Sequence, residues 1–136
     1  GVSLESKLGT VAHSDGDVLL HAIMDALLGA CALGDIGLHF PDTKPEYRGA
    51  DSIELLKHVV TLVAAEGMRI VNIDSTVVLE APRLRPHIDA MRACIAEAMG
   101  LEIKRVSIKA TTNERLGFVG REEGIAAYAA AQLETA

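Results

Sequence analysis

The sequence is short of cysteine and of positive charge, and each shortage excludes a class of protein. Its two cysteines, Cys31 and Cys94, form no CxxC pair, and each falls in a stretch that we expect to be helical. They are typical of small buried residues in a reducing compartment, so we expect no disulfide. Lys and Arg number 13 against 19 Asp and Glu, which leaves a net charge of −6. Such a balance argues against a long nucleic-acid backbone as partner.

The sequence also lacks an apolar run long enough for a membrane. The longest such stretch, residues 18–33, is interrupted by His21 and Asp25, and it is too short and too charged to span a bilayer. Hydrophobic residues nevertheless make up 49% of the 136 residues. This excludes disorder and predicts one soluble domain with a single core. The chain starts at Gly1, without Met or a signal-like segment, and we expect its true start to be missing.

Titratable side chains gather in residues 13–25, a stretch with three carboxylates and two imidazoles that continues into an apolar helix. Asp17, His21 and Asp25 are spaced i, i+4 and i+8, so they lie on one stripe of that helix. Their neighbours are apolar nearly all round, as in a buried helix. A buried charge is costly unless it is paired or bound to a metal. Two interpretations stay open: Asp15 and Asp17 cap the helix while His21 is a core histidine, or the stripe belongs to a site.

The remaining elements follow from residue period and from start and stop signals. We expect strands over 2–5, 68–80 and 105–111, a turn over 7–10, and helices over 17–33, 51–66 and 86–99. The Ala-rich tail over 125–133 fits a helix by propensity and a tightly packed strand by its period of two. The order predicts an α+β fold, a two-layer sandwich with helices on one face of a mixed sheet.

Two loops carry polar chemistry. Residues 34–45 are rich in Gly, Pro and Asp and form a candidate lid or pocket wall. Residues 81–86 contain two prolines that fix the backbone path. This second loop could read a flat ligand such as a base while Arg83 and Arg85 meet phosphate, or it could be a plain strand-to-helix connection.

A third group of polar residues follows the strand over 105–111. Thr111, Thr112 and Glu114 supply two hydroxyls and a carboxylate, with exposed backbone amides between them. Phosphate and metal sites use such groups.

Five motifs occur together and in order, and their combination is far more specific than any one of them. They are His13-Ser14-Asp15-Gly16-Asp17-x-x-x-His21, Gly34-Asp35-Ile36-Gly37, Phe40-Pro41-Asp42-Thr43, Ala81-Pro82-Arg83-x-x-Pro86-His87, and Lys109-Ala110-Thr111-Thr112-x-Glu114-x-Leu116-Gly117-Phe118-x-Gly120-Arg121-x-Glu123-Gly124. Over essentially its whole length the chain resembles the 2-C-methyl-D-erythritol 2,4-cyclodiphosphate synthases of the non-mevalonate isoprenoid pathway.

The resemblance implies a homotrimer with active sites between subunits and a strand for the tail. It implies that the 2-phosphate of a cytidine diphosphate methylerythritol attacks the β-phosphorus, closing a cyclic diphosphate and releasing CMP. No nucleic acid or membrane is implied as partner. The expected location is the bacterial cytoplasm, with the plastid stroma as the alternative.

The resemblance also assigns residues. His21 matches one of three ligands of a zinc ion, and Glu114 matches a carboxylate that places magnesium or manganese at the diphosphate. His13 and Thr112 match the catalytic transition-state stabilisers. Asp25 would orient the ligands of the metal or form a core ion pair. The matched substrate-binding positions are His13, Ser14, Asp35, Ile36, Gly37, Phe40, Pro41, Asp42, Thr43, Lys44, Leu79, Glu80, Ala81, Pro82, Arg83, Leu84, Arg85, Thr111, Thr112, Asn113, Glu114, Phe118 and Arg121.

Among these positions, 35–37 would hold the methylerythritol hydroxyls and 40–44 would close over them. Residues 79–85 and Thr111 would bind cytidine, mainly through the backbone, from a neighbouring subunit.

The chain departs from the family in one serious respect, besides Arg83 where the family commonly has Lys and Asn113 where it often has a third Thr. The family's first strand carries an Asp-x-His that supplies the other two zinc ligands, and this sequence contains no such pattern. One histidine cannot hold tetrahedral zinc, so we expect an N-terminal strand before Gly1. The alternative functions are a catalytically silent trimeric module that binds nucleotide or isoprenoid diphosphate near Arg121 and Glu123, or another metal-dependent phosphohydrolase.

Overall fold

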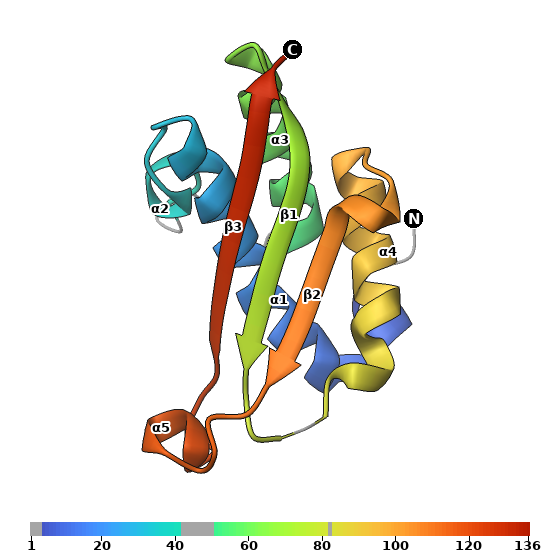
Figure 1. Cartoon of the computed structure of the whole chain (residues 1–136), viewed down its shortest axis with the longest axis vertical. Helices are drawn as coiled ribbons and strands as arrows, with labels where there is room; N and C mark the ends of the chain where they lie inside the picture. Colours follow the sequence, from blue (N-terminus) through green and yellow to red (C-terminus); the bar gives the residue numbers. More distant parts are fainter. Residues whose placement is uncertain (1–3, 42–50, 82) are drawn as a thin grey trace.

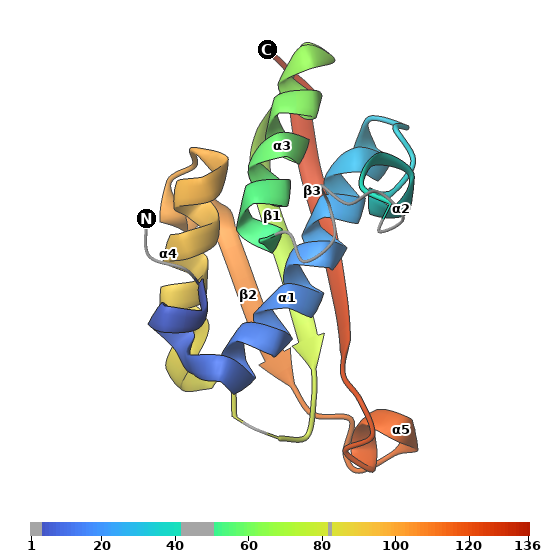
Figure 2. The ribbon, with the colours of Figure 1, turned by 180° about the vertical axis from the view of Figure 1, so that it is seen from behind.

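Three long helices cover one face of a three-stranded sheet, as expected for an α+β sandwich. The computed structural model describes residues 4–41, 51–81 and 83–136, with the backbone alone over 4–15. Helices α1, α3 and α4 lie behind the sheet in Figure 1 and in front of it in Figure 2. The elements are α1 (Leu4–Ala30), α2 (Ile36–His39), α3 (Ser52–Ala65), β1 (Met68–Val78), the 3-10 turn η2 (Arg85–His87), α4 (Ile88–Met99), the 3-10 turn η3 (Ile103–Arg105), β2 (Val106–Thr111), α5 (Gly117–Gly120) and β3 (Ala126–Thr135).

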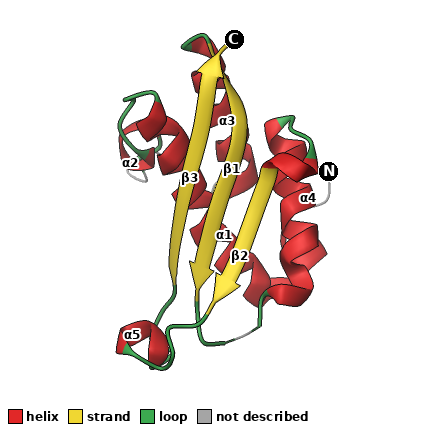
Figure 3. Ribbon diagram, viewed as in Figure 1, coloured by secondary structure: helices red, strands yellow, loops and turns green. Residues whose placement is uncertain are grey.

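The sheet is mixed and has the order β2-β1-β3 (Figure 3). Strand β1 runs parallel to β2 and antiparallel to β3. The Ala-rich tail is therefore a strand, as the resemblance implied. Its Ala127, Ala129 and Ala131 pack against the core, while Tyr128 between them is exposed. Pairing along the whole of β1 outweighs the helical propensity of alanine.

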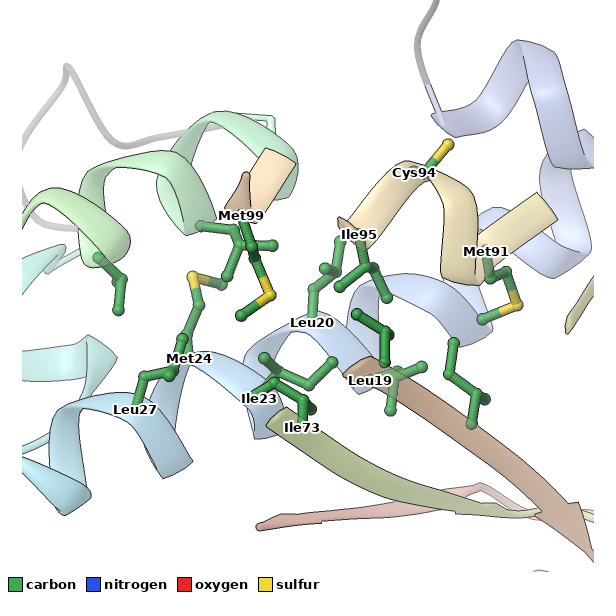
Figure 4. Packing of buried hydrophobic residues seen from close by; sticks show 14 of the residues in the cluster. Leu19, Leu20, Ile23, Met24, Leu27, Ile73, Met91, Cys94, Ile95 and Met99 are labelled. Carbon is green, nitrogen blue, oxygen red and sulfur yellow. The ribbon is translucent and has the colours of Figure 1, made fainter. Parts of the chain in front are cut away.

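The core lies between α1, α4 and the sheet, and Figure 4 shows its central contacts. Among its described side chains, helix α1 contributes six fully buried residues, Leu19, Leu20, Ile23, Met24, Leu27 and Leu28. They pack against Ile73 of β1 and against Met91, Ile95 and Met99 of α4. The apolar stretch predicted to be a buried helix is therefore the centre of the fold.

Helix α1 differs from its predicted bounds of 17–33 at both ends. It already includes Leu4 and Glu5 and the segment 7–10, so the predicted turn is wrong, as is the predicted strand over 2–5 as far as it is described. An alternation of four residues is too short to separate a strand from a helix. The helix ends at Ala30 because Ala32 turns left-handed with φ 55°. The amide of Leu33 then donates to the Leu28 carbonyl at 2.9 Å, which closes the helix before Gly34.

The other elements follow their signals closely. Asp51 caps α3 by accepting from the Ile53 amide at 2.9 Å, and Gly67 beyond its end has φ 75°. Gly100 ends α4 in the left-handed region with φ 67°. Strands β1 and β2 are one or two residues shorter than predicted, the helix expected from residue 86 starts as η2, and the single turns α2 and α5 were not predicted.

Candidate active site

Asp17, His21 and Ser52 form the first polar cluster, between α1 and α3. The Ser52 hydroxyl is buried and donates to Asp17 Oδ1. His21 Nε2 lies 3.5 Å from Ser52 Oγ and 3.7 Å from Asp17 Oδ2. The His21 side chain is 45% exposed. The interpretation of Asp17 as a helix cap is therefore wrong, because it lies well inside α1, and His21 is not a core histidine.

Asp25 does not join this cluster, although it shares its stripe. It is exposed, and its Oδ1 accepts the backbone amide of Ile36 at 2.9 Å. Asp35 caps the same short helix α2 by accepting from the Leu38 amide at 3.0 Å. The core ion pair predicted for Asp25 is therefore wrong, because its carboxylate is exposed and accepts a backbone amide, whereas its role towards a metal stays a prediction. Its carboxylate instead tethers the Gly34-Asp35-Ile36-Gly37 motif to α1.

The Phe40 side chain, just after α2, is buried in the hydrophobic core. It is 8% exposed and belongs to the core cluster. Its ring meets the ring of His58 edge-on, with centroids 5.2 Å apart. Pro41 beside it is half-buried and Gly37 is exposed. Phe40 thus anchors the segment that would close over a substrate.

A pocket of about 550 Å³ opens where β1 and β2 end. It is lined by Leu79, Glu80, Arg83, Leu84, Arg85, Pro86, Ala110, Thr111 and Thr112. Seven of these nine residues are ones that the sequence analysis assigned to substrate. Leu84 is 1% exposed and anchors the loop, whereas Ala81, Arg83 and Arg85 are exposed. A pocket with an anchored backbone and outlying guanidinium groups suits a flat polar ring that carries phosphates.

The loop after β2 carries Thr112 and Glu114, and side chains hold its amides. Glu80 Oε1 accepts from the Asn113 amide at 3.0 Å and from the Arg115 amide at 2.8 Å. The Thr112 hydroxyl accepts from the Glu114 amide at 3.3 Å. Glu114 and Arg115 are both left-handed, with φ 55° and 62°. The Glu114 residue is exposed.

Phe118 and Arg121 lie in and just after α5. Phe118 is 51% exposed, and Gly124 lies against its ring. The Arg121 guanidinium donates to both carboxylate oxygens of Glu123, at 2.9 and 3.2 Å. Arg121 also lines a second, smaller pocket of about 370 Å³ together with Glu80 and Arg115.

The predicted site residues form two groups in one chain. The first, Asp35, Ile36 and Gly37 at α2, lies beside the β3 edge, and the second, made of the pocket residues, lies at the end of the sheet near α5 (Figure 1). His21 lies in the middle of α1. His13 and Ser14 belong to the α1 backbone, and nothing further is described of them. Asp42, Thr43, Lys44 and Pro82 lie outside the described residues.

Donor atoms for a metal are sparse. Within the described ranges, no three His, Cys, Asp or Glu side chains gather so as to hold an ion. Both cysteines are free: Cys94 is buried in α4, whereas Cys31 is half-buried and lies just beyond α1 rather than in the helix. Burial, with the nearby Glu66 charge, raises the pKa of the Cys31 thiol. The hydrogen bond from Lys109 lowers the pKa of Asp74 on the open face of the sheet.

Sequence reasoning missed several of these contacts. Ser52 was assigned no role in the site, although its hydroxyl lies beside Asp17 and His21, which are 31–35 residues away in the sequence. Glu80 was assigned to substrate, and its contact with the loop 33–35 residues later was not foreseen. Pro86 and Ala110 line the pocket without having been assigned to substrate. No local signal marks such contacts, because they depend on which elements pack side by side.

A membrane-spanning helix is absent from the part of the chain that the structure describes, since no helix there is both long enough and apolar enough.

Comparison with known proteins places these observations in a family. The model of the YgbB family matches residues 1–134. The 2-C-methyl-D-erythritol 2,4-cyclodiphosphate synthase of Pseudomonas aeruginosa strain LESB58 is 61% identical over 133 residues, which cover 98% of this chain and 85% of the relative. That of Pseudomonas fluorescens strain ATCC BAA-477 is 60% identical over 134 residues, with the same coverage.

Solved structures agree with this. The bifunctional IspDF of Campylobacter jejuni superposes with a TM-score of 0.84 at 42% identity, over 88% of this chain and 32% of that longer chain. IspF of Plasmodium falciparum, solved as a CDP complex, has a TM-score of 0.78 at 28% identity, over 90% of this chain and 74% of the neighbour.

Proposed function

The chain belongs to the YgbB family, whose curated relatives are 2-C-methyl-D-erythritol 2,4-cyclodiphosphate synthases of isoprenoid biosynthesis, and from this premise we propose how it works. It converts 4-diphosphocytidyl-2-C-methyl-D-erythritol 2-phosphate to the 2,4-cyclodiphosphate and CMP. We place the reaction in the bacterial cytoplasm, since these relatives are bacterial.

The proposed reaction is an intramolecular phosphoryl transfer. An oxygen of the 2-phosphate bonds to the β-phosphorus, the bond from that phosphorus to the bridging oxygen breaks, and CMP leaves with the electron pair. No covalent enzyme intermediate is needed. Catalysis then consists of folding the substrate so that attacking and leaving oxygens are in line, and of stabilising phosphate charge.

The observation that carries this proposal is the pocket at the ends of β1 and β2. Its lining combines the loop over 79–86 with Thr111 and Thr112, the residues that the resemblance assigns to cytidine and to the transition state. The CDP complex of the Plasmodium falciparum relative supports a cytidine nucleotide as the ligand. In this pocket the backbone would select the base, while the Thr112 hydroxyl would donate to a phosphate oxygen.

The two metal ions that the resemblance implies, zinc at His21 and magnesium or manganese at Glu114, are supported to different degrees by the described residues. The described residues do not complete a zinc site around His21, so we derive no step through zinc and propose His21 only as one of its ligands. The exposed carboxylate of Glu114 offers the oxygen donors that magnesium or manganese prefers. Such an ion, when bound, would offset negative charge on the α- and β-phosphates.

We also propose that the active protein is a homotrimer with sites shared between subunits. The support is that the α2 segment lies beside the β3 edge of one chain, whereas the pocket lies where β1 and β2 end, near α5 (Figure 1). A substrate that needs both groups would then lie between one subunit's cytidine pocket and its neighbour's His21 and α2. Symmetric assembly supplies such a shared site at every interface.

Incubation with substrate and manganese, followed by measurement of CMP and cyclic product, tests the activity. Release of inorganic phosphate would instead indicate a hydrolase, and nucleotide binding without CMP would indicate a silent module. Mixed trimers test the shared site. If His21→Ala and Thr112→Ala chains, each inactive alone, are co-expressed in equal amounts, about one quarter of the sites combine two intact partners, one half times one half. No recovery of activity would contradict the shared site.

A further inference from the structure

Glu80 lies at the point where the pocket meets the loop after β2. Strand β1 ends at Val78, but the Leu79 amide still donates to the Thr111 carbonyl at 3.0 Å. This extra bond keeps the chain beside β2 for one more residue. The half-buried Glu80 side chain consequently stands between the pocket of Leu79 and Thr112 and the smaller pocket lined by Arg115 and Arg121.

One carboxylate oxygen of Glu80 holds two amides of that loop. Oε1 accepts from the Asn113 amide at 3.0 Å and from the Arg115 amide at 2.8 Å. The amide between them, of Glu114, donates to the Thr112 hydroxyl. Three consecutive amides are thus satisfied by side chains. Hydrogen bonds from amides to a carboxylate are stronger than those to a neutral acceptor.

The loop has a backbone that needs such support. Glu114 and Arg115 have φ 55° and 62°, a region that residues with a Cβ enter only at a cost in free energy. On the far side, a Cβ placed on Gly120 would lie 2.0 Å from the Arg115 carbonyl carbon. The Arg115 backbone therefore lies close to Gly120 and also donates its amide to the Glu80 carboxylate.

We propose that Glu80 acts through its side chain as a positioning residue. Its carboxylate holds the 112–115 loop in the left-handed conformation that presents the Thr112 hydroxyl and the Glu114 carboxylate to the diphosphate in the adjacent pocket. The inference rests on the proposed function for the identity of that ligand. It assigns to Glu80 a mechanical role that differs from contact with cytidine through the backbone.

Four variants of the full chain test this. Glu80→Gln keeps an acceptor oxygen and loses the charge, whereas Glu80→Met keeps the length and loses the acceptor. Glu80→Ala is the second deletion, in case methionine fails to fold. Glu102→Ala is the control, since this exposed glutamate contacts Lys104 far from the loop.

Hydrogen exchange of peptides that cover residues 112–117 measures how well the backbone amides of this loop are protected. We expect exchange to be about tenfold faster or more in Glu80→Met, and close to wild type in Glu80→Gln and Glu102→Ala. Turnover should fall about 100-fold in Glu80→Met, because displacement of the loop by about 1 Å has that effect. The Kd for CMP should change less than about threefold, since CMP lacks the β-phosphate to which this loop is presented.

Two results would overturn the role. If Glu80→Met shows wild-type exchange and turnover, neither depends on the hydrogen bonds from the loop amides to Glu80. If exchange and turnover change equally in Glu80→Gln and Glu80→Met, the charge of Glu80 matters rather than its binding of the amides. Failure of the proposed function has a separate signature, since wild type and Glu102→Ala would then release no CMP. The exchange measurement would still decide whether Glu80 holds the loop.

Discussion

Replacement of Gly120 by alanine should disable the site through a backbone clash. The new Cβ would lie 2.0 Å from the carbonyl carbon of Arg115, and 2.6 Å from its Cα and its oxygen. Ordinary contact begins at 3.4 Å, so the gap must widen from 2.0 to at least 3.4 Å. No rotamer change can relieve this, because the atoms that clash are main chain. The loop that carries Thr112 and Glu114 and the helix α5 must therefore move apart by more than about 1 Å.

The expected effects differ between activity and stability. Turnover should fall about 100-fold, as for other misplacements of this size. Unfolding should become easier by about 1–3 kcal/mol, the usual cost of overpacking, which corresponds to a fall in Tm of roughly 4–12 °C for a domain of this size. The assays are CMP release under saturating substrate and thermal unfolding followed by circular dichroism.

Gly29→Ala is the matched control, since the same methyl group is added at an exposed helical position of α1. Nothing lies within 4 Å of its Cβ, so we expect wild-type turnover and a gain of about 0.5–1 kcal/mol from helix propensity. If Gly120→Ala keeps turnover within about threefold of wild type at an unchanged Tm, the reasoning from the clash is refuted.

Three further predictions concern the other contacts. Asp25→Ala removes the acceptor of the Ile36 amide, so KM should rise about tenfold, while Asp25→Asn keeps an acceptor and should have a KM near that of wild type. Steady-state kinetics measure this, and the same KM in Asp25→Ala and wild type would contradict the role of Asp25 in holding α2. Lys109→Met removes the bond that depresses the pKa of Asp74. A carboxyl group whose pKa is lower in the folded than in the unfolded state stabilises the fold at pH values above the unfolded-state pKa, and this stabilisation is lost as the pH falls. Urea titration at pH 7 should therefore find the variant less stable than wild type by about 0.2–1 kcal/mol, a small difference because both side chains are about half exposed. The difference should vanish below the folded-state pKa of Asp74. In a protein that carries the complete metal site, His21→Ala should lose bound zinc by elemental analysis and lose activity while the oligomer persists; full zinc occupancy would refute the ligand role.

The elements that could be predicted from the sequence are those with local signals. Asp51 and Gly67 bracket α3, and the alternation over 68–80 marked β1 with its buried Ile73 and Val77. Capping, stop signals and side-chain alternation act within a few residues, so they do not depend on the rest of the fold. Where the local signal was weak, as over 2–10, the prediction was wrong.

The candidate site was predicted in its parts but not in its connections. Motifs placed the residues of the pocket in two separate stretches, and the structure brings those stretches together at one sheet end. That Asp25 binds the Ile36 amide rather than joining His21 was not predictable from their spacing. A carboxylate on a helix face can bond to any donor that packing brings within reach, and the spacing says nothing of where α2 will lie.

The sequence alone determined the class of fold, the presence of a buried apolar helix and the five motifs that point to a cyclodiphosphate synthase. Tertiary structure alone decided that Ser52 lies beside His21 and that Glu80 holds the loop after β2, and it confirmed the strand that the resemblance implied for the Ala-rich tail. The reason is range. Periodicity and capping act over one turn or one strand, whereas these contacts join residues at least 31 positions apart and exist only because β1 pairs with β2 and β3 and α1 packs against α3.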